Sequence, residues 1–148
     1  MACYSSCMKS AAKWKVQDKP GLLLAILEKL GGNVHISFEG DLRGFSLDKF
    51  PGACDKETPI LKRNTIWPKQ DFLVVPLESS MGQKLLSAIS GAVPQRILHI
   101  QIEKDGVSQF AAYDNFDPES LCWGPALNQE FLESLSSRGI LEPTRART

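Results

Sequence analysis

The chain is poor in the residues on which disulfide scaffolds and metal sites depend. Its 148 residues include four cysteines and two histidines, and the formal net charge is zero. The cysteines, at positions 3, 7, 54 and 122, are too few and too irregularly spaced for a disulfide framework. Cys3 and Cys7 could meet on one helical turn, but a metal site there would need two more thiols or imidazoles, and none lies near them in sequence. We expect free thiols and no metal or other cofactor.

Balanced charge and short apolar runs argue against two classes of partner. Proteins that bind nucleic acid usually carry a basic excess, whereas the basic residues between Lys56 and Lys69 are diluted by acidic neighbours. A membrane-spanning helix needs roughly 18 apolar residues in a row, and the longest block here runs from Leu22 to Leu27. The amino terminus lacks the charged and apolar regions of a secretory signal. We predict no nucleic-acid partner, no membrane insertion and a cytoplasmic location.

Motifs that name a reaction are also missing. The sequence has no phosphate-binding glycine loop, no Gly-x-Ser-x-Gly elbow and no His-Glu-x-x-His pattern. Cys122 as a nucleophile would need a base, and neither histidine is close to it in sequence. The sequence therefore indicates no catalytic residue, and we favour a protein that is not an enzyme.

The sequence does contain an internal repeat, a six-residue pattern that occurs twice. The segment Val34-His35-Ile36-Ser37-Phe38-Glu39 recurs as Leu98-His99-Ile100-Gln101-Ile102-Glu103, which puts the two histidines at matching places. Each copy follows a short apolar strand and a helical segment closed by glycine, and each leads into a further strand. In the second copy Asp105-Gly106 is a strong signal for a tight hairpin. Such a period predicts a duplicated unit of strand, helix, strand and strand.

The predicted fold is therefore α+β and ferredoxin-like, with duplicated βαββ units. We expect a mainly antiparallel sheet with the helices on one face. The pseudo-repeat halves span about 13–48 and 71–114 of a single domain, 1–148, and a C-terminal helical extension follows at 117–141. Strands are predicted at 14–17, 34–39, 43–47, 72–77, 97–103 and 107–113, and repeat helices at 22–32 and 85–91. Three prolines interrupt the join at 49–70, whose apolar residues Ile60, Leu61, Ile66 and Trp67 we expect to be buried, with room for a short extra strand.

The stretch from Val16 to Val34, which includes Pro20-Gly21-Leu22-Leu23 and Gly31-Gly32, resembles the opening of amino-acid-binding ACT domains. That resemblance implies a ligand held near the turn from the first strand into the first helix. The second copy departs from it, since Ser79-Ser80-Met81-Gly82 stands where the Pro-Gly pair is expected. The duplicated layout is also similar to gyrase-inhibitor-like effector-binding domains, which implies a small molecule in a groove between halves.

Alternation along the two echoed strands puts His35, Glu39, His99 and Glu103 on the face away from the helices. Two imidazoles and two carboxylates that converge could bind a divalent metal or act as acid and base. Alternatively they decorate a solvated sheet face, and replacing either histidine then changes stability by less than about 0.5 kcal/mol. We expect the second outcome.

Two more candidates lie at the end of the last predicted strand, where a loop presents polar groups. Tyr113 and Asp114 could hydrogen-bond a ligand, or Asp114 could cap the next helical turn. The complete set of candidate ligand-binding residues is His35, Glu39, His99, Glu103, Tyr113 and Asp114.

These observations favour a non-enzymatic module that binds a small-molecule ligand or has a regulatory role. A first alternative is a small metal-assisted hydrolase or isomerase that uses the His/Glu face of the sheet. A second is a structural α+β protein whose exposed sheet face forms a homodimer.

Overall fold

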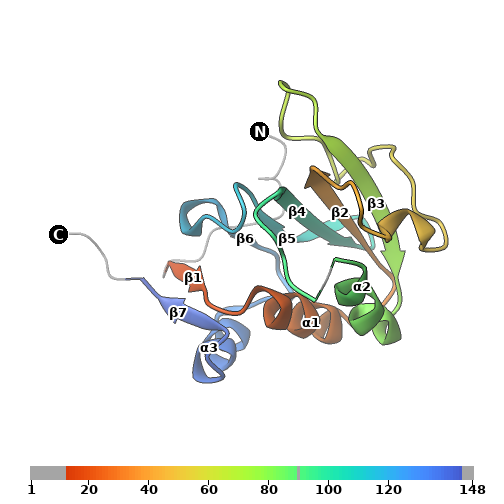
Figure 1. Cartoon of the computed structure of the whole chain (residues 1–148). Coiled ribbons are helices and arrows are strands. Elements are labelled where there is room, and N and C mark those ends of the chain that lie inside the picture. The colour runs from red at the N-terminus through yellow and green to blue at the C-terminus, as the bar shows by residue number, and fades with distance from the viewer. Residues whose placement is uncertain (1–12, 90, 145–148) are drawn as a thin grey trace.

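The computed structural model describes residues 13–89 and 91–144, and its centre is a five-stranded antiparallel sheet in the order β3-β2-β4-β5-β6 (Figure 1). Two strands, β1 (Trp14–Val16) and β7 (Leu141–Pro143), form a separate small sheet. The strands of the main sheet are β2 (Val34–Gly40), β3 (Asp71–Leu77), β4 (Ile97–Lys104), β5 (Val107–Ala112) and β6 (Cys122–Trp123). The predicted α+β class and mainly antiparallel pairing are confirmed.

Two neighbouring helices, α1 (Lys19–Leu30) and α2 (Gly82–Ala88), pack below the main sheet (Figure 1). Helix α1 begins where the Asp18 side chain accepts a hydrogen bond from the Gly21 N–H at 2.9 Å, and Pro20 occupies its first turn. It ends at Gly31, whose φ of 77° is the left-handed conformation that glycine adopts without strain.

The main core lies between these helices and the inner face of the sheet. Alternate residues of β2, β4 and β5 point into it and are fully buried: Val34, Ile36, Phe38, Ile100, Ile102 and Phe110. Leu22, Leu23 and Ile26 of α1 and Leu85 of α2 belong to the same cluster. Burying each such side chain contributes about 1.5–3 kcal/mol, which makes this layer the main source of stability.

The carboxyl-terminal part of the described chain adds helix α3 (Gln129–Ser137) and then β7. The Asn128 side chain caps α3 by accepting the Phe131 N–H at 3.0 Å. Strand β7 pairs antiparallel with β1, with Val16 opposite Leu141, and was not predicted. The described residues also form three short 3₁₀ helices: η2 (Leu47–Lys49), η3 (Ser79–Met81) and η4 (Pro118–Ser120).

The two echoed segments are neighbours at the centre of the sheet, because β2 pairs with β4. Ser37 lies opposite Gln101 at the middle of the pairing. His35 lies opposite Glu103, and Glu39 lies opposite His99. Each histidine therefore faces the glutamate of the other copy.

The duplicated βαββ layout itself is not confirmed. Residues 43–47, predicted as a strand, form a turn that leads into η2. The Arg43 backbone N–H donates to the Asp41 carboxylate at 3.2 Å, and Gly44 has a φ of 84°, so the chain bends away from the sheet after β2. Strand β1 pairs with β7 instead of joining the main sheet. The first half thus contributes one strand to that sheet, whereas the second contributes β3, β4 and β5.

None of the described helices is long and apolar enough to cross a membrane. Cys3 and Cys7 lie outside the described residues.

Candidate functional site

The face of the sheet opposite the helices carries polar side chains that are nevertheless buried. Ser37, Glu39, His99, Gln101 and Glu103 are each at most 7% exposed. The expectation of a solvated face is therefore wrong. Its cause lies in residues 54–70, here named the covering loop, which cross this face between η2 and β3.

Apolar contacts hold part of the covering loop down. Leu61 is fully buried against Phe72 and Val74 of β3, and Ile60 packs beside them. Leu61 thus follows the prediction and Ile60 is partly buried, but Ile66 and Trp67 do not follow it, since they are 95% and 84% exposed. In the described part of the chain, the loop's pairing with the sheet is a single bridge between Cys54 and Val74, so the extra strand is not formed.

Hydrogen bonds from the loop to the two glutamates of the sheet add a second attachment. The Glu39 carboxylate accepts the backbone N–H groups of Asn64 at 2.8 Å and Thr65 at 3.0 Å. The Glu103 carboxylate accepts the Thr58 hydroxyl at 3.1 Å. These bonds satisfy carboxylates that would be costly to bury without partners.

Gln101 links the middle of the loop to β5. Its side-chain oxygen accepts the Lys62 N–H at 3.0 Å, and its amide nitrogen donates to the Tyr113 hydroxyl at 3.2 Å. As the loop runs from Thr58 to Thr65, its partners on β4 run backwards from Glu103 through Gln101 to His99. The loop therefore lies antiparallel to β4, above the sheet.

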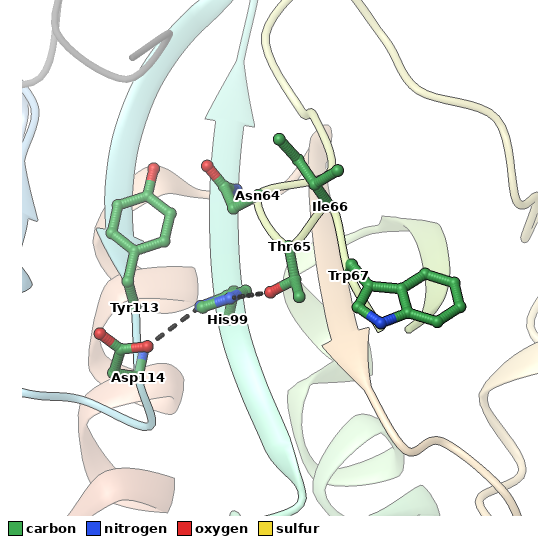
Figure 2. A pocket seen from close by; sticks show the side chains of 7 residues that line it. All are labelled: Asn64, Thr65, Ile66, Trp67, His99, Tyr113 and Asp114. Carbon is green, nitrogen blue, oxygen red and sulfur yellow. Dashed lines mark hydrogen bonds between the residues drawn. The ribbon is translucent and has the colours of Figure 1, made fainter. Parts of the chain in front are cut away.

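Both ring nitrogens of His99 have partners (Figure 2). Its Nε2 is 2.8 Å from the Thr65 hydroxyl oxygen, and its Nδ1 accepts the Asp114 backbone N–H at 3.2 Å. Because a backbone N–H can only donate, the neutral ring carries its proton on Nε2 and donates it to Thr65. This network assigns the tautomer.

The Asp114 N–H is aimed at His99 by an uncommon turn. Asp114, Asn115 and Phe116 have φ values of 52°, 53° and 65°, a left-handed conformation that costs free energy in residues other than glycine. The Asp117 N–H closes the turn on the Tyr113 carbonyl at 3.1 Å. The Asn115 side chain donates to the carbonyls of Pro94 and Ile97 and accepts a hydrogen bond from Lys19, so the turn is tied to β4 and α1.

A pocket of about 540 Å³ opens between this turn and the covering loop (Figure 2). Its size falls within the range of small-molecule sites. The loop supplies one wall and the ends of β4 and β5 the other, and the lining residues are Asn64, Thr65, Ile66, Trp67, His99, Tyr113 and Asp114. Figure 2 shows the Tyr113 and Trp67 rings on either side of the His99–Thr65 pair.

Three of the six predicted site residues, His99, Tyr113 and Asp114, line this pocket. Glu39 anchors the backbone of the loop beside it, and Glu103 holds the loop at Thr58. His35 is half-buried and lies four strand positions from the level of His99, roughly 13 Å along the strands. The described residues contain no group of three His, Cys, Asp or Glu placed to hold a metal ion.

The sequence pattern does not predict the four lining residues of the covering loop, Asn64 to Trp67. A signal was present, because Ile66-Trp67 directly precedes Pro68 in a segment with no regular apolar period. Hydrophobicity alone predicts that this apolar pair is core.

Comparisons with protein-family models, with curated proteins and with solved structures find no match to this chain. The likeness to ACT domains therefore stays a local one. The turn at Asp18–Pro20 caps α1 and does not line the pocket.

Proposed function

We propose that the protein is a non-enzymatic binding module that holds a small molecule in the pocket between the covering loop and the 114–116 turn. The observation that carries this proposal is the exposure of Ile66 and Trp67 on the pocket wall. The loop that presents them is otherwise attached to the sheet by hydrogen bonds. Leaving a tryptophan in water forgoes a large gain in hydrophobic free energy. A ligand that covers its ring would recover that gain.

The state of His99 supports binding rather than catalysis. With its proton on Nε2 the ring donates to Thr65 and cannot accept a proton from that hydroxyl, so the pair is not a nucleophile with its base. Glu39 already accepts two backbone N–H groups below the pocket wall. The metal-assisted alternative gains no support, since His35 and His99 stand at opposite ends of the β2–β4 pairing.

The alternative of a homodimer formed through the sheet face gains little support either. The outer face of β2 and β4, which would have to be open, is occupied by the covering loop. Leu61 and the buried polar residues beneath the loop would have to be uncovered first.

A thermal-shift screen with amino acids, amines, carboxylic acids and other metabolites tests the proposal. A ligand that binds the folded state raises the melting temperature with the logarithm of its concentration above Kd. We expect at least one compound to stabilise the native chain and a Lys69→Ala control, which changes a residue outside the pocket lining. The same compound should not stabilise Trp67→Ala. If no compound in the panel raises the melting temperature, the proposal is wrong.

A further inference from the structure

We propose that the pocket recognises an organic ammonium head group, held by the Asp114 carboxylate and the rings of Trp67 and Tyr113. This inference rests on the proposed function and names the class of ligand for the same pocket.

The first argument is the charge of the lining. Asp114 is its one carboxylate, and no lysine or arginine is among the seven lining residues. His99 adds no positive charge, because its two hydrogen bonds fit the neutral ring. Arg63, the basic residue next to Asn64, is engaged elsewhere: its guanidinium lies over the Phe72 ring at 5.1 Å and donates to the Gln70 carbonyl at 2.8 Å. A cation therefore meets an attractive charge here, and an anion meets a repulsive one.

The second argument is the pair of aromatic side chains. Tyr113 is fixed, because its hydroxyl accepts a hydrogen bond from Gln101 and its ring contacts His99 edge-on at 5.5 Å. Trp67 stands on the other side of the pocket with its indole open to solvent (Figure 2). Aromatic faces carry negative electrostatic potential and attract ammonium groups, and tryptophan does so most strongly. Rings on two sides with a carboxylate nearby suit a cation better than a neutral molecule of the same shape.

The third argument is that most polar side chains near the pocket already bind the covering loop, whereas Asp114 is available to a ligand. The polar side chains below the loop are used internally: Glu39, Gln101 and Glu103 all bind the loop itself. The Asp114 side chain is exposed and lies on the pocket side of its turn. It is therefore placed to meet a ligand without breaking the contacts that hold the loop.

The test compares three probes of nearly equal shape: choline, the neutral 3,3-dimethylbutan-1-ol and the anionic 3,3-dimethylbutanoate. Each is titrated into the labelled full chain, and binding is followed by the amide signals of Thr65 and Asp114 and the Trp67 indole signal. We expect choline to bind at least tenfold more tightly than either other probe. Asp114→Asn and Trp67→Leu should each weaken choline binding severalfold, whereas Lys15→Gln, at an exposed position of β1 in the separate small sheet, should leave it unchanged.

Equal or tighter binding of the neutral or anionic probe in the pocket would overturn the ammonium proposal and leave the binding function standing. Choline that moves no signal of the lining would overturn it too. The binding function itself fails only if the thermal-shift screen also yields no ligand that depends on Trp67.

Discussion

Glu39 and His99 face each other directly across β2 and β4, and both bind the same residue, Thr65. Glu39 accepts the Thr65 backbone N–H at 3.0 Å, while the His99 ring bonds the Thr65 hydroxyl at 2.8 Å. One cross-strand pair thus fixes the backbone and the side chain of a single loop residue. The next two residues, Ile66 and Trp67, are thereby held at the pocket although they are exposed.

Replacing Glu39 by glutamine should destabilise the protein by about 1–3 kcal/mol, because the new amide group would be buried with its donor pointing at the backbone N–H of Asn64 or Thr65. Both carboxylate oxygens are in use, and the residue is 1% exposed. Urea unfolding of native and Glu39→Gln protein measures the difference. Glu28→Gln, at an exposed position of α1, is the matched control and should stay within about 0.5 kcal/mol of the native chain. Equal stability of the two variants would contradict the anchoring role of Glu39.

The His99 ring is expected in the Nε2-protonated tautomer at neutral pH. Nitrogen NMR of labelled protein distinguishes the two neutral tautomers through the shifts and proton couplings of Nδ1 and Nε2. His35, which is half-buried on the neighbouring strand, gives an internal comparison in the same spectrum. A proton found on Nδ1 would contradict the Asp114 hydrogen bond and would free Nε2 to act as a base.

Gly40→Ala should be far more destabilising than Gly139→Ala, although both glycines have positive φ values, of 150° and 76°. At Gly139 a Cβ would meet no atom within 4 Å, so the cost is that of the left-handed backbone, roughly 1–2 kcal/mol. At Gly40 the Cβ would lie 2.2 Å from the Arg96 carbonyl oxygen, which requires the β2–β4 pairing to shift. Chemical denaturation of the two variants measures both effects, and equal losses would show that the strands are not this close.

Asp41 should stay ionised to low pH. Two hydrogen bonds of 2.9 Å from the Arg43 guanidinium lower its pKa from 3.8 to about 2, with help from the Arg43 backbone N–H. A folded pKa below the unfolded one means that the contribution to stability is present above about pH 4 and is lost as the pH falls through about 2. Carboxyl-carbon NMR follows the titration directly. Arg43→Gln should move the midpoint back towards 3.8, and an unchanged midpoint would assign the shift to another cause.

The parts of the fold that sequence could predict are those with strong local signals. Alternation located β2 and β4, and the Pro-Gly opening and the glycine stop located α1. The Asp105-Gly106 pair located the β4–β5 hairpin, where both residues have positive φ values. Strand β7 escaped prediction because its three residues are paired with β1 at the far end of the described chain. Such pairing depends on long-range contacts that no local pattern encodes.

The sequence also predicts only part of the candidate site. Period-two alternation correctly put Glu39 and His99 on one face, opposite the helices. It could not show that this face is covered, because the cover comes from backbone groups of Asn64 and Thr65 in an irregular loop. Hydrophobicity alone also predicts that Trp67 is core, but its side chain is exposed. Thr65, two residues earlier, is the residue that is hydrogen-bonded to the sheet through His99.

The most direct test of the binding account is to map where a ligand from the thermal-shift screen binds. Amide and indole signals of the labelled native chain are recorded as the ligand is added. The account predicts that the largest changes fall on the pocket lining, residues 64–67, 99, 113 and 114, and that they disappear in Trp67→Ala. Changes centred on the helix-covered face or on the β1–β7 sheet, with the lining unmoved, would contradict it.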